Sequence, residues 1–275
     1  MRMSRPWSNS RNPTGFIVGN AKGPDRASPT AGSHHPMTLL QNIPLNLRES
    51  DILRRVGFGG RRRIRPQIKV LMHELMQEIE ACRLLEPSAV YRYFRVEAVS
   101  DARTILEGGR ILRGSLLPTL FSRAKYLALA VATIGHGIED LASRYTRDGR
   151  VLRGMLLDGM GSAAVDQLAR NVHLHVMEKA ISMGYRASGA VNPGMPGLPL
   201  SEQRPMFQWL SARRIGVKLT SSGIMIPRKS TSMIIGVGSE MPSWTQSTVC
   251  KKCNLRSSCP YRVPSGDSDK SDGKV

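Results

Sequence analysis

Residues 216–238 read GVKLTSSGIMIPRKSTSMIIGVG and contain two strand-like segments joined by a polar loop. In the first segment, Val217 and Leu219 alternate with Lys218 and Thr220, which is the period of a half-buried strand. The chain then turns through Ser, Gly and Pro and returns as a second strand at 232–238. Because the loop carries hydroxyl groups, a glycine, a proline and two cations, it predicts a surface that can face a polar anionic ligand.

Upstream of this region the hydrophobic periodicity predicts a mixture of helices and strands. Apolar residues recur every three or four positions from Ile68 to Cys82, which predicts an amphipathic helix with the Cys82 thiol buried on its apolar face. The other predicted elements are helices over 51–56, 135–141 and 155–183, strands over 90–96 and 126–134, and a hairpin over 104–112 that turns at Gly108 and Gly109. Since helices and strands do not alternate strictly, we expect an α+β fold with a curved antiparallel sheet flanked by helices.

The composition is that of a basic, globular chain. Its 275 residues suit one or two domains, and a net charge of +19 predicts attraction to anionic partners. No run approaches the roughly 18 apolar residues that span a bilayer, and the cysteines do not resemble a secreted disulfide framework, so we expect a cytoplasmic protein. Residues 1–36 and 265–275 are polar and expected to be disordered tails, the first of them basic, around a main domain at 37–240 and an extension at 241–264.

Three of the four cysteines, Cys250, Cys253 and Cys259, lie together in that extension. A Cys-x-x-Cys hairpin with a third thiol six residues later can place three thiolates around one metal. Neighbouring lysines and arginines favour the thiolate forms. The cluster therefore predicts a metal site, for which zinc and an iron–sulfur cluster are open alternatives, and the sequence does not identify the fourth ligand.

Several short segments share a distinctive order and spacing. They are Thr133-Ile134-Gly135, 157–162 (LDGMGS), 184–186 (GYR), 192–195 (NPGM), 199–203 (PLSEQ) and 220–232. Together they resemble the activation domain of cobalamin-dependent methionine synthase, and most closely its stand-alone relatives, over roughly residues 51–238. One departure concerns the family motif Arg-x-x-x-Gly-Tyr, because here Arg186 is separated from Gly194 by seven residues and Met195 stands in the Tyr position.

The resemblance implies a site that binds S-adenosylmethionine above a cobalamin. Arg186 would clamp the ligand carboxylate through two parallel hydrogen bonds, and Gly194 would let the backbone approach because it has no Cβ. We expect the loops at 186–195 and 220–229 to converge on one cleft. The implied binding residues are Arg186, Pro193, Gly194, Met195, Thr220, Ser222, Met225 and Pro227.

The resemblance also implies a reaction. In this family, cobalamin in the inactive cob(II) state is reduced by one electron and trapped by methyl transfer from S-adenosylmethionine. The chain has no Asp-x-His-x-x-Gly corrinoid motif, so the cobalamin would arrive on a corrinoid protein or a cobalamin-dependent methyltransferase. An iron–sulfur cluster on the three cysteines would be a built-in electron donor, and a separate donor protein is the other source. No hydrolase or phosphate-loop motif is present, and no catalytic residue is assigned.

Two other functions are open at this point. One is a non-catalytic cofactor- or partner-binding module with a structural metal, which would bind S-adenosylmethionine without consuming it. The other is a zinc-containing nucleic-acid binder that uses the basic run at 61–65, and its binding would fall steeply with salt. That run has no interleaved aromatic residues, which favours a solvated surface over a nucleic-acid site.

The cysteine cluster yields a direct prediction. If one metal is held by all three thiolates, changing Cys250, Cys253 or Cys259 to Ser removes the same metal in each case, because the attachment is shared. Cys82→Ser is the matched control and should leave the metal content intact. Elemental analysis of the four purified variants is the measurement. Metal retained after Cys250→Ser and Cys253→Ser would contradict the prediction, and metal lost after Cys82→Ser would identify the fourth ligand.

Overall fold

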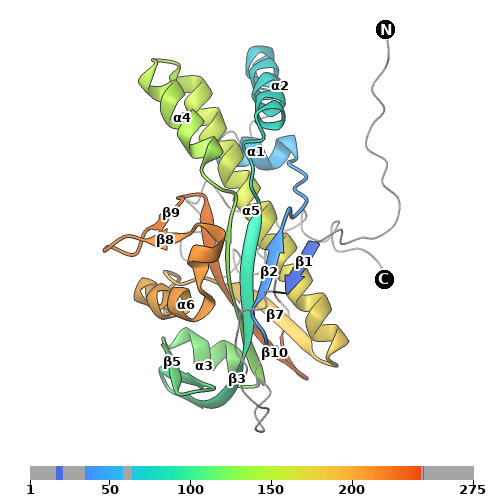
Figure 1. The fold of residues 1–275 in the computed structure, drawn as a ribbon, viewed down its shortest axis with the longest axis vertical. Coiled ribbons are helices and arrows are strands. Elements are labelled where there is room, and N and C mark those ends of the chain that lie inside the picture. Colours follow the sequence, from blue (N-terminus) through green and yellow to red (C-terminus); the bar gives the residue numbers. More distant parts are fainter. Residues whose placement is uncertain (1–16, 21–34, 58–63, 243, 245–275) are drawn as a thin grey trace.

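One large antiparallel sheet organises the part of the chain that the computed structural model describes, namely residues 17–20, 35–57, 64–242 and 244 (Figure 1). Across the sheet its strands are β1 (Ile17–Asn20), β2 (Thr38–Gln41), β3 (Ser88–Ser100), β6 (Tyr126–Thr133), β10 (Ser230–Gly238) and β7 (Arg186–Val191). The hairpin of β4 (Arg103–Leu106) and β5 (Arg110–Arg113) pairs with the far end of β3.

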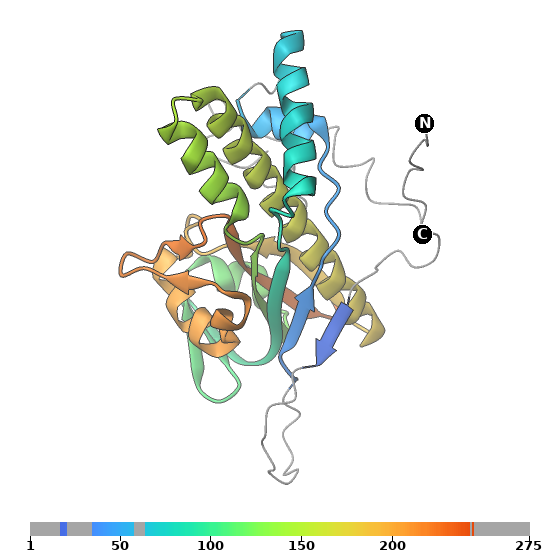
Figure 2. The same ribbon diagram turned by 45° about the horizontal axis from the view of Figure 1, so that its top comes forward.

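Helices cover both faces of this sheet. The 32-residue helix α5 (Val151–Ser182), about 48 Å long, contacts β6, β7 and β10 on one face. Beyond the sheet it meets α1 (Glu49–Arg55), α2 (Pro66–Ala81) and α4 (Gly137–Arg147), so these helices project together from one end of the molecule (Figure 2). The opposite face carries α3 (Leu116–Phe121), α6 (Gln203–Leu210) and the 3-10 turns η1 (Leu200–Glu202) and η2 (Ala212–Ile215).

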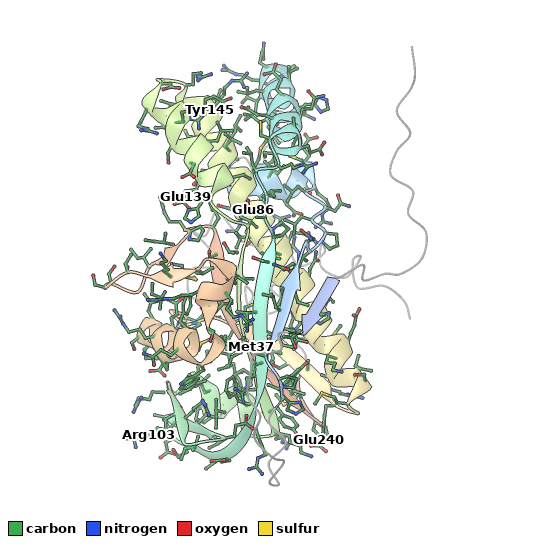
Figure 3. All side chains as sticks on the ribbon, viewed as in Figure 1. Met37, Glu86, Arg103, Glu139, Tyr145 and Glu240 are labelled. Atoms are coloured by element: carbon green, nitrogen blue, oxygen red, sulfur yellow. The ribbon has the colours of Figure 1, made fainter. Side chains whose placement is uncertain are left out.

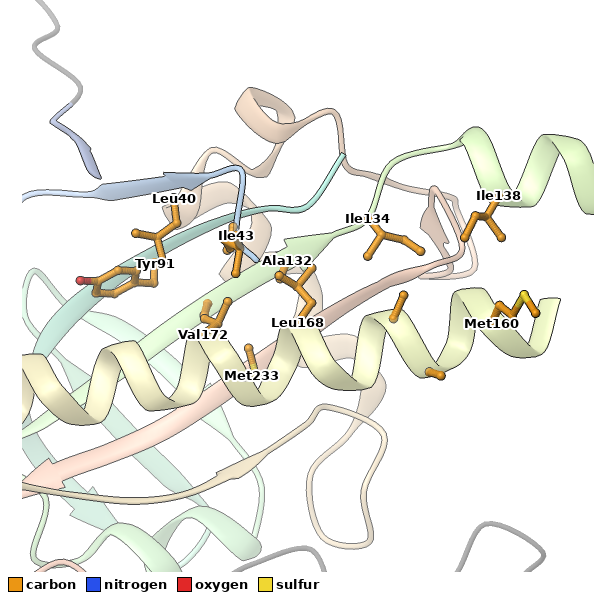
Figure 4. Close-up of a cluster of buried hydrophobic side chains, with 14 of the residues drawn as sticks. Leu40, Ile43, Tyr91, Ala132, Ile134, Ile138, Met160, Leu168, Val172 and Met233 are labelled. Carbon is orange, nitrogen blue, oxygen red and sulfur yellow. The ribbon is translucent and has the colours of Figure 1, made fainter. Parts of the chain in front are cut away.

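The alternation of side-chain size in the central strand explains why α5 lies where it does. In β6, which reads YLALAVAT, the alanines belong to the core cluster under α5, whereas the leucines and Val131 belong to the cluster on the other face. Alanines let the helix approach the sheet closely, and the larger Tyr91 and Tyr93 of β3 fill the space beside them. The Tyr93 hydroxyl donates to the carbonyl of Val176 in α5 at 2.9 Å. Figure 4 shows this cluster, in which Ala132 lies with Leu168 and Val172.

The glycines of α5 fix its contacts with the other helices. A Cβ on Gly159 would lie 2.3 Å from a methyl carbon of Val56, at the end of α1. A Cβ on Gly154 would lie 2.3 Å from the hydroxyl oxygen of Thr146 in α4. These separations are far below van der Waals contact, so helices can pack this closely only where α5 has no side chain.

The structure confirms the predicted mixture of helices with an antiparallel sheet. The hairpin over 104–112 is confirmed, with its turn at Gly108 and Gly109, both at positive φ. The helix predicted at 155–183 begins earlier, at Val151, and the strand predicted at 90–96 extends over 88–100. Strand β7 and the helices α3 and α6 were not predicted, because each has only six to eight residues, too few for a hydrophobic period to stand out.

Two expectations are corrected by the structure. Cys82 is exposed and not buried, because α2 ends at Ala81 and the last buried residue on its apolar face is Ile79. Residues 17–20, inside the expected disordered tail, form β1 and pair with β2. Residues 1–16 and 21–34 of that tail, the basic residues 61–63 and the three clustered cysteines lie outside the described residues. In the described ranges, α5 and the other helices are too short or too polar to cross a membrane.

The core under α5 yields a stability prediction. Leu168 is fully buried, whereas Leu174 on the same helix is 40% exposed. Leu168→Ala should lower the free energy of unfolding by about 2–5 kcal/mol, since it removes buried methyl groups and leaves a cavity. Leu174→Ala, the matched control, should change it by less than about 1 kcal/mol. Urea unfolding followed by circular dichroism measures both, and equal losses would show that this face of α5 is not the core.

Candidate functional site

The strand order brings loops that are distant in sequence to one edge of the sheet. β10 lies antiparallel between β6 and β7, so its first residues adjoin the last residues of both neighbours. Ser230 is paired with Thr133, and Ile234 with Val191. The turn after β6, the loop after β7 and the loop before β10 therefore meet at the same place, which we call the loop edge.

The loop before β10 folds as a small hairpin made of β8 (Lys218–Leu219) and β9 (Met225–Ile226). The Thr220 hydroxyl accepts a hydrogen bond from the amide of Ile224 at 3.0 Å and lies 2.9 Å from the hydroxyl of Ser222. The turn needs a residue at positive φ, which Gly223 supplies at +86°. The predicted strand at 216–220 is therefore shorter than expected, and both candidate hydroxyls help to close the turn that carries them.

A buried glutamine joins this hairpin to α6. The side-chain amide of Gln203, which is 3% exposed, donates to the carbonyl of Gly223 at 3.2 Å. Its oxygen accepts from the hydroxyl of Ser232 at 3.0 Å. The next residue, Arg204, donates to the carbonyl of Ser221. Segments 199–203 and 220–232 are thus held together by hydrogen bonds that satisfy buried polar groups.

Lys229 holds the other end of the hairpin against α5. Its ammonium nitrogen lies 2.8 Å from a carboxylate oxygen of Asp158 and 2.9 Å from the hydroxyl of Ser162. Its carbonyl accepts from the amide of Ile134 at 3.2 Å. A Cβ on Gly161 would lie 3.2 Å from the Lys229 side chain, so the glycine makes room for it. Segments 133–135 and 157–162 therefore meet the same loop.

The loop after β7 shapes a cavity beside the hairpin. The Asn192 amide donates to the carbonyl of Ser232 at 2.6 Å, and Gly194 takes φ +98° while donating to the carbonyl of Leu198. The cavity has a volume of about 440 Å³ and is lined by Gly114, Ser115, Gly194, Met195, Gly197, Leu198, Pro199 and Leu200. Ideal Cβ positions on Gly194 and Gly223 lie 3.5 and 4.0 Å from methyl carbons of Leu200, so Leu200 adjoins both loops.

The structure does not bring Arg186 to the loop edge. Arg186 is the first residue of β7 and pairs with Gly238, whereas Val191 at the other end pairs with Ile234. Six extended residues separate the two ends by about 17 Å. Arg186 instead lines a different cavity with Arg123 and Glu240. Figure 3 shows the separation, since Glu240 lies at the opposite end of the molecule from Glu139, whose carboxylate accepts from the Arg228 amide at 2.8 Å.

The other candidate binding residues lie at the loop edge but differ in exposure. Gly194 and Ser222 are exposed, and Met195, Thr220 and Met225 are partly buried. Pro193 and Pro227 are buried, which limits them to shaping the loops. Counting back through the motif Arg-x-x-x-Gly-Tyr from Gly194 reaches Ala190, so this chain has no arginine at that motif position.

Sequence reasoning missed three residues that hold the site together: Asn192, Gln203 and Lys229. Only Gln203 gave a signal in the sequence, because it is a polar residue whose neighbours suggest the start of a helix. Its hydrogen-bond partners could not be inferred, since they lie 20 and 29 positions away.

Among the described residues, no group of three His, Cys, Asp or Glu side chains could hold a metal. His173 and His175, two positions apart on α5, contact Ser188 and Tyr91 respectively.

Comparisons with known proteins bear on the fold. No family model matches the chain, and no curated protein sequence matches it. Among solved structures, the chain is similar to the reactivation domain of MetH, determined with bound AdoHcy, at a TM-score of 0.53 and 16% sequence identity. The match covers 70% of this chain and 72% of that one. This likeness places the chain in the class of proteins with a MetH reactivation-domain-like fold.

The Gln203 bridge yields a prediction. Gln203→Leu should lower the free energy of unfolding by about 1–3 kcal/mol, because the Gly223 carbonyl and the Ser232 hydroxyl lose their partner inside the protein. Gln77→Leu, at an exposed position of α2, is the matched control and should change it by less than about 0.5 kcal/mol. Hydrogen exchange at residues 220–224 should accelerate only in the Gln203 variant. Unchanged exchange there would mean that the bridge does not hold the hairpin.

Proposed function

We propose that this protein binds S-adenosylmethionine at the loop edge and supports the reductive methylation of a corrinoid carried by a partner. The supporting observation is a fold like that of a reactivation domain solved with AdoHcy, combined with a cavity at the loop that matches the Pro-Gly part of the family motif.

The cavity fits an adenosyl group in size and chemistry. Its volume of about 440 Å³ falls in the range typical of small-molecule sites. Three of its eight lining residues are glycines, which let backbone amides and carbonyls approach a ligand. The side chains of Met195, Leu198 and Leu200 supply apolar contact, and Ser115 supplies a hydroxyl.

The amino-acid end of the ligand needs a cation that the cavity lining lacks. Arg186 stands at the other edge, so we propose Arg204 for this role, since it already contacts the hairpin through Ser221. Its guanidinium can form two parallel hydrogen bonds to a carboxylate. The hydroxyls of Thr220 and Ser222, on the same hairpin, are proposed as further polar contacts, with Met225 beside the turn that carries them.

When bound to the partner, a corrinoid would supply the metal chemistry, namely one-electron reduction by a donor protein and acceptance of the sulfonium methyl group, with S-adenosylhomocysteine as the product. This chain's share is to hold the ligand with its methyl group directed outward from the cavity, because correct positioning supplies much of the rate. The fixed hairpin and the loop after β7 would set that direction. The cysteine cluster remains proposed as an iron–sulfur or zinc site.

A second candidate function is favoured by the same departures from the family motif. Met195 replaces the tyrosine and Ala190 stands at the arginine position, so this chain can bind S-adenosylmethionine without consuming it. Incubation with S-adenosylmethionine, a corrinoid protein in the cob(II) state and a one-electron donor separates the two functions. Formation of S-adenosylhomocysteine supports reactivation, and binding without product supports a sensing or docking module.

Ligand binding yields a prediction for three arginine and glycine variants. Arg204→Gln should weaken S-adenosylmethionine binding by about 1.5–3 kcal/mol, the scale of a lost charge-assisted hydrogen bond. Gly194→Ala should also weaken it, because the φ of +98° disfavours any side chain. Arg186→Gln is the matched control and should leave affinity unchanged. Titration calorimetry on proteins shown to be folded is the measurement, and an effect confined to Arg186→Gln would move the site to the other edge.

A further inference from the structure

The larger cavity of the two lies at the edge opposite the loop edge. It has a volume of about 720 Å³ and forms where the end of α3, the start of β7 and the residues after β10 come together. Its lining residues are Thr119, Leu120, Ser122, Arg123, Arg186, Ser239, Glu240, Met241 and Pro242. Most of these are polar, which distinguishes it from the apolar, glycine-rich cavity beside Met195.

Positive charge dominates this cavity. Arg186 is exposed, and within the described part of the chain its guanidinium has no hydrogen bond or ion pair. Arg123 pairs with Glu240 at 2.7 Å, but both side chains are about 70% exposed, 72% and 70%, so water competes with the pair. Two arginines therefore face one carboxylate, and the second guanidinium is left for a ligand.

The surroundings add to this field. Lys125 donates to the Tyr185 hydroxyl at 2.6 Å, next to Arg186 in sequence. That hydrogen bond raises the pKa of Lys125 above its ordinary value. Ser122 and Ser239 supply hydroxyl donors in the lining. Guanidinium and hydroxyl donors around one cavity are the groups that bind phosphate and carboxylate oxygens.

We propose that this cavity binds a small oxyanion, a phosphate or carboxylate group, through Arg186 and Arg123. Glu240 acts there as an internal competitor, because it occupies Arg123 and repels an incoming anion. The site is separate from the proposed S-adenosylmethionine site, so either can fail without the other. It also gives Arg186 a ligand at the edge where the fold places it.

The test titrates the full chain with two probes, inorganic phosphate and succinate, by calorimetry and, for phosphate, by phosphorus NMR line broadening. Arg186→Gln should weaken binding at least about tenfold, as expected for a lost charge-assisted contact. Glu240→Gln should strengthen it about two- to fivefold, the scale of an exposed ion pair. Arg213→Gln removes an equally exposed arginine that does not line the cavity and should change nothing.

The Arg213 control separates a site from general surface charge, because general charge would make Arg213→Gln weaken anion binding as much as Arg186→Gln does. If phosphate binds and Arg186→Gln weakens that binding, the ligand group is a phosphate. If succinate binds in the same Arg186-dependent way, the ligand group is a carboxylate. No binding of either probe, or binding that survives Arg186→Gln, overturns the proposal. Thermal unfolding of each variant confirms that the comparison is made between folded proteins.

Discussion

The pairing of β10 between β6 and β7 is the constraint on which the arrangement of both sites depends. Because all three strands are antiparallel neighbours, the register Ser230 with Thr133 and Gly238 with Arg186 decides which loops share an edge. A strand keeps its ends apart by its length, so residues that are close in sequence along β7 reach opposite edges of the sheet, about 17 Å apart. The sheet thus separates what the sequence places side by side, and joins segments that are far apart in the chain.

Local pattern was enough to predict much of this framework. The alternation in β6, the turn at Gly108 and Gly109 and the period of Leu168, Val172 and Val176 in α5 are properties of short windows, and the structure contains each of these elements. The curvature expected of the sheet stays a prediction. The element ends were less accurate, as Cys82 shows, because a helix ends where capping and tertiary contacts decide and not where its apolar period fades.

The candidate site could be predicted only in part, for a physical reason. Segments 133–135, 157–162, 199–203 and 220–232 were recognised together from their order and spacing, and the structure makes them neighbours through Lys229 and Gln203. Those contacts join positions tens of residues apart, which no local window contains. Arg186 was assigned to the same site through the family resemblance, but the extended backbone of β7 separates it from Gly194. The cysteine cluster stays a prediction, since it lies outside the described residues.

The attachment of the β8–β9 hairpin has a consequence for how a ligand enters. The hairpin is fastened near its tip by Gln203 and Arg204, and at its base by Lys229. A swing in either direction would break a buried hydrogen bond at one end or an ion pair at the other. The hairpin is therefore a stationary wall, and not a lid. A ligand in the cavity beside Met195 would thus lie beside a fixed hairpin and against the loop after β7, whose turns are closed by backbone hydrogen bonds from Gly194 to Leu198, from Leu198 to Met195 and from Met195 to Asn192.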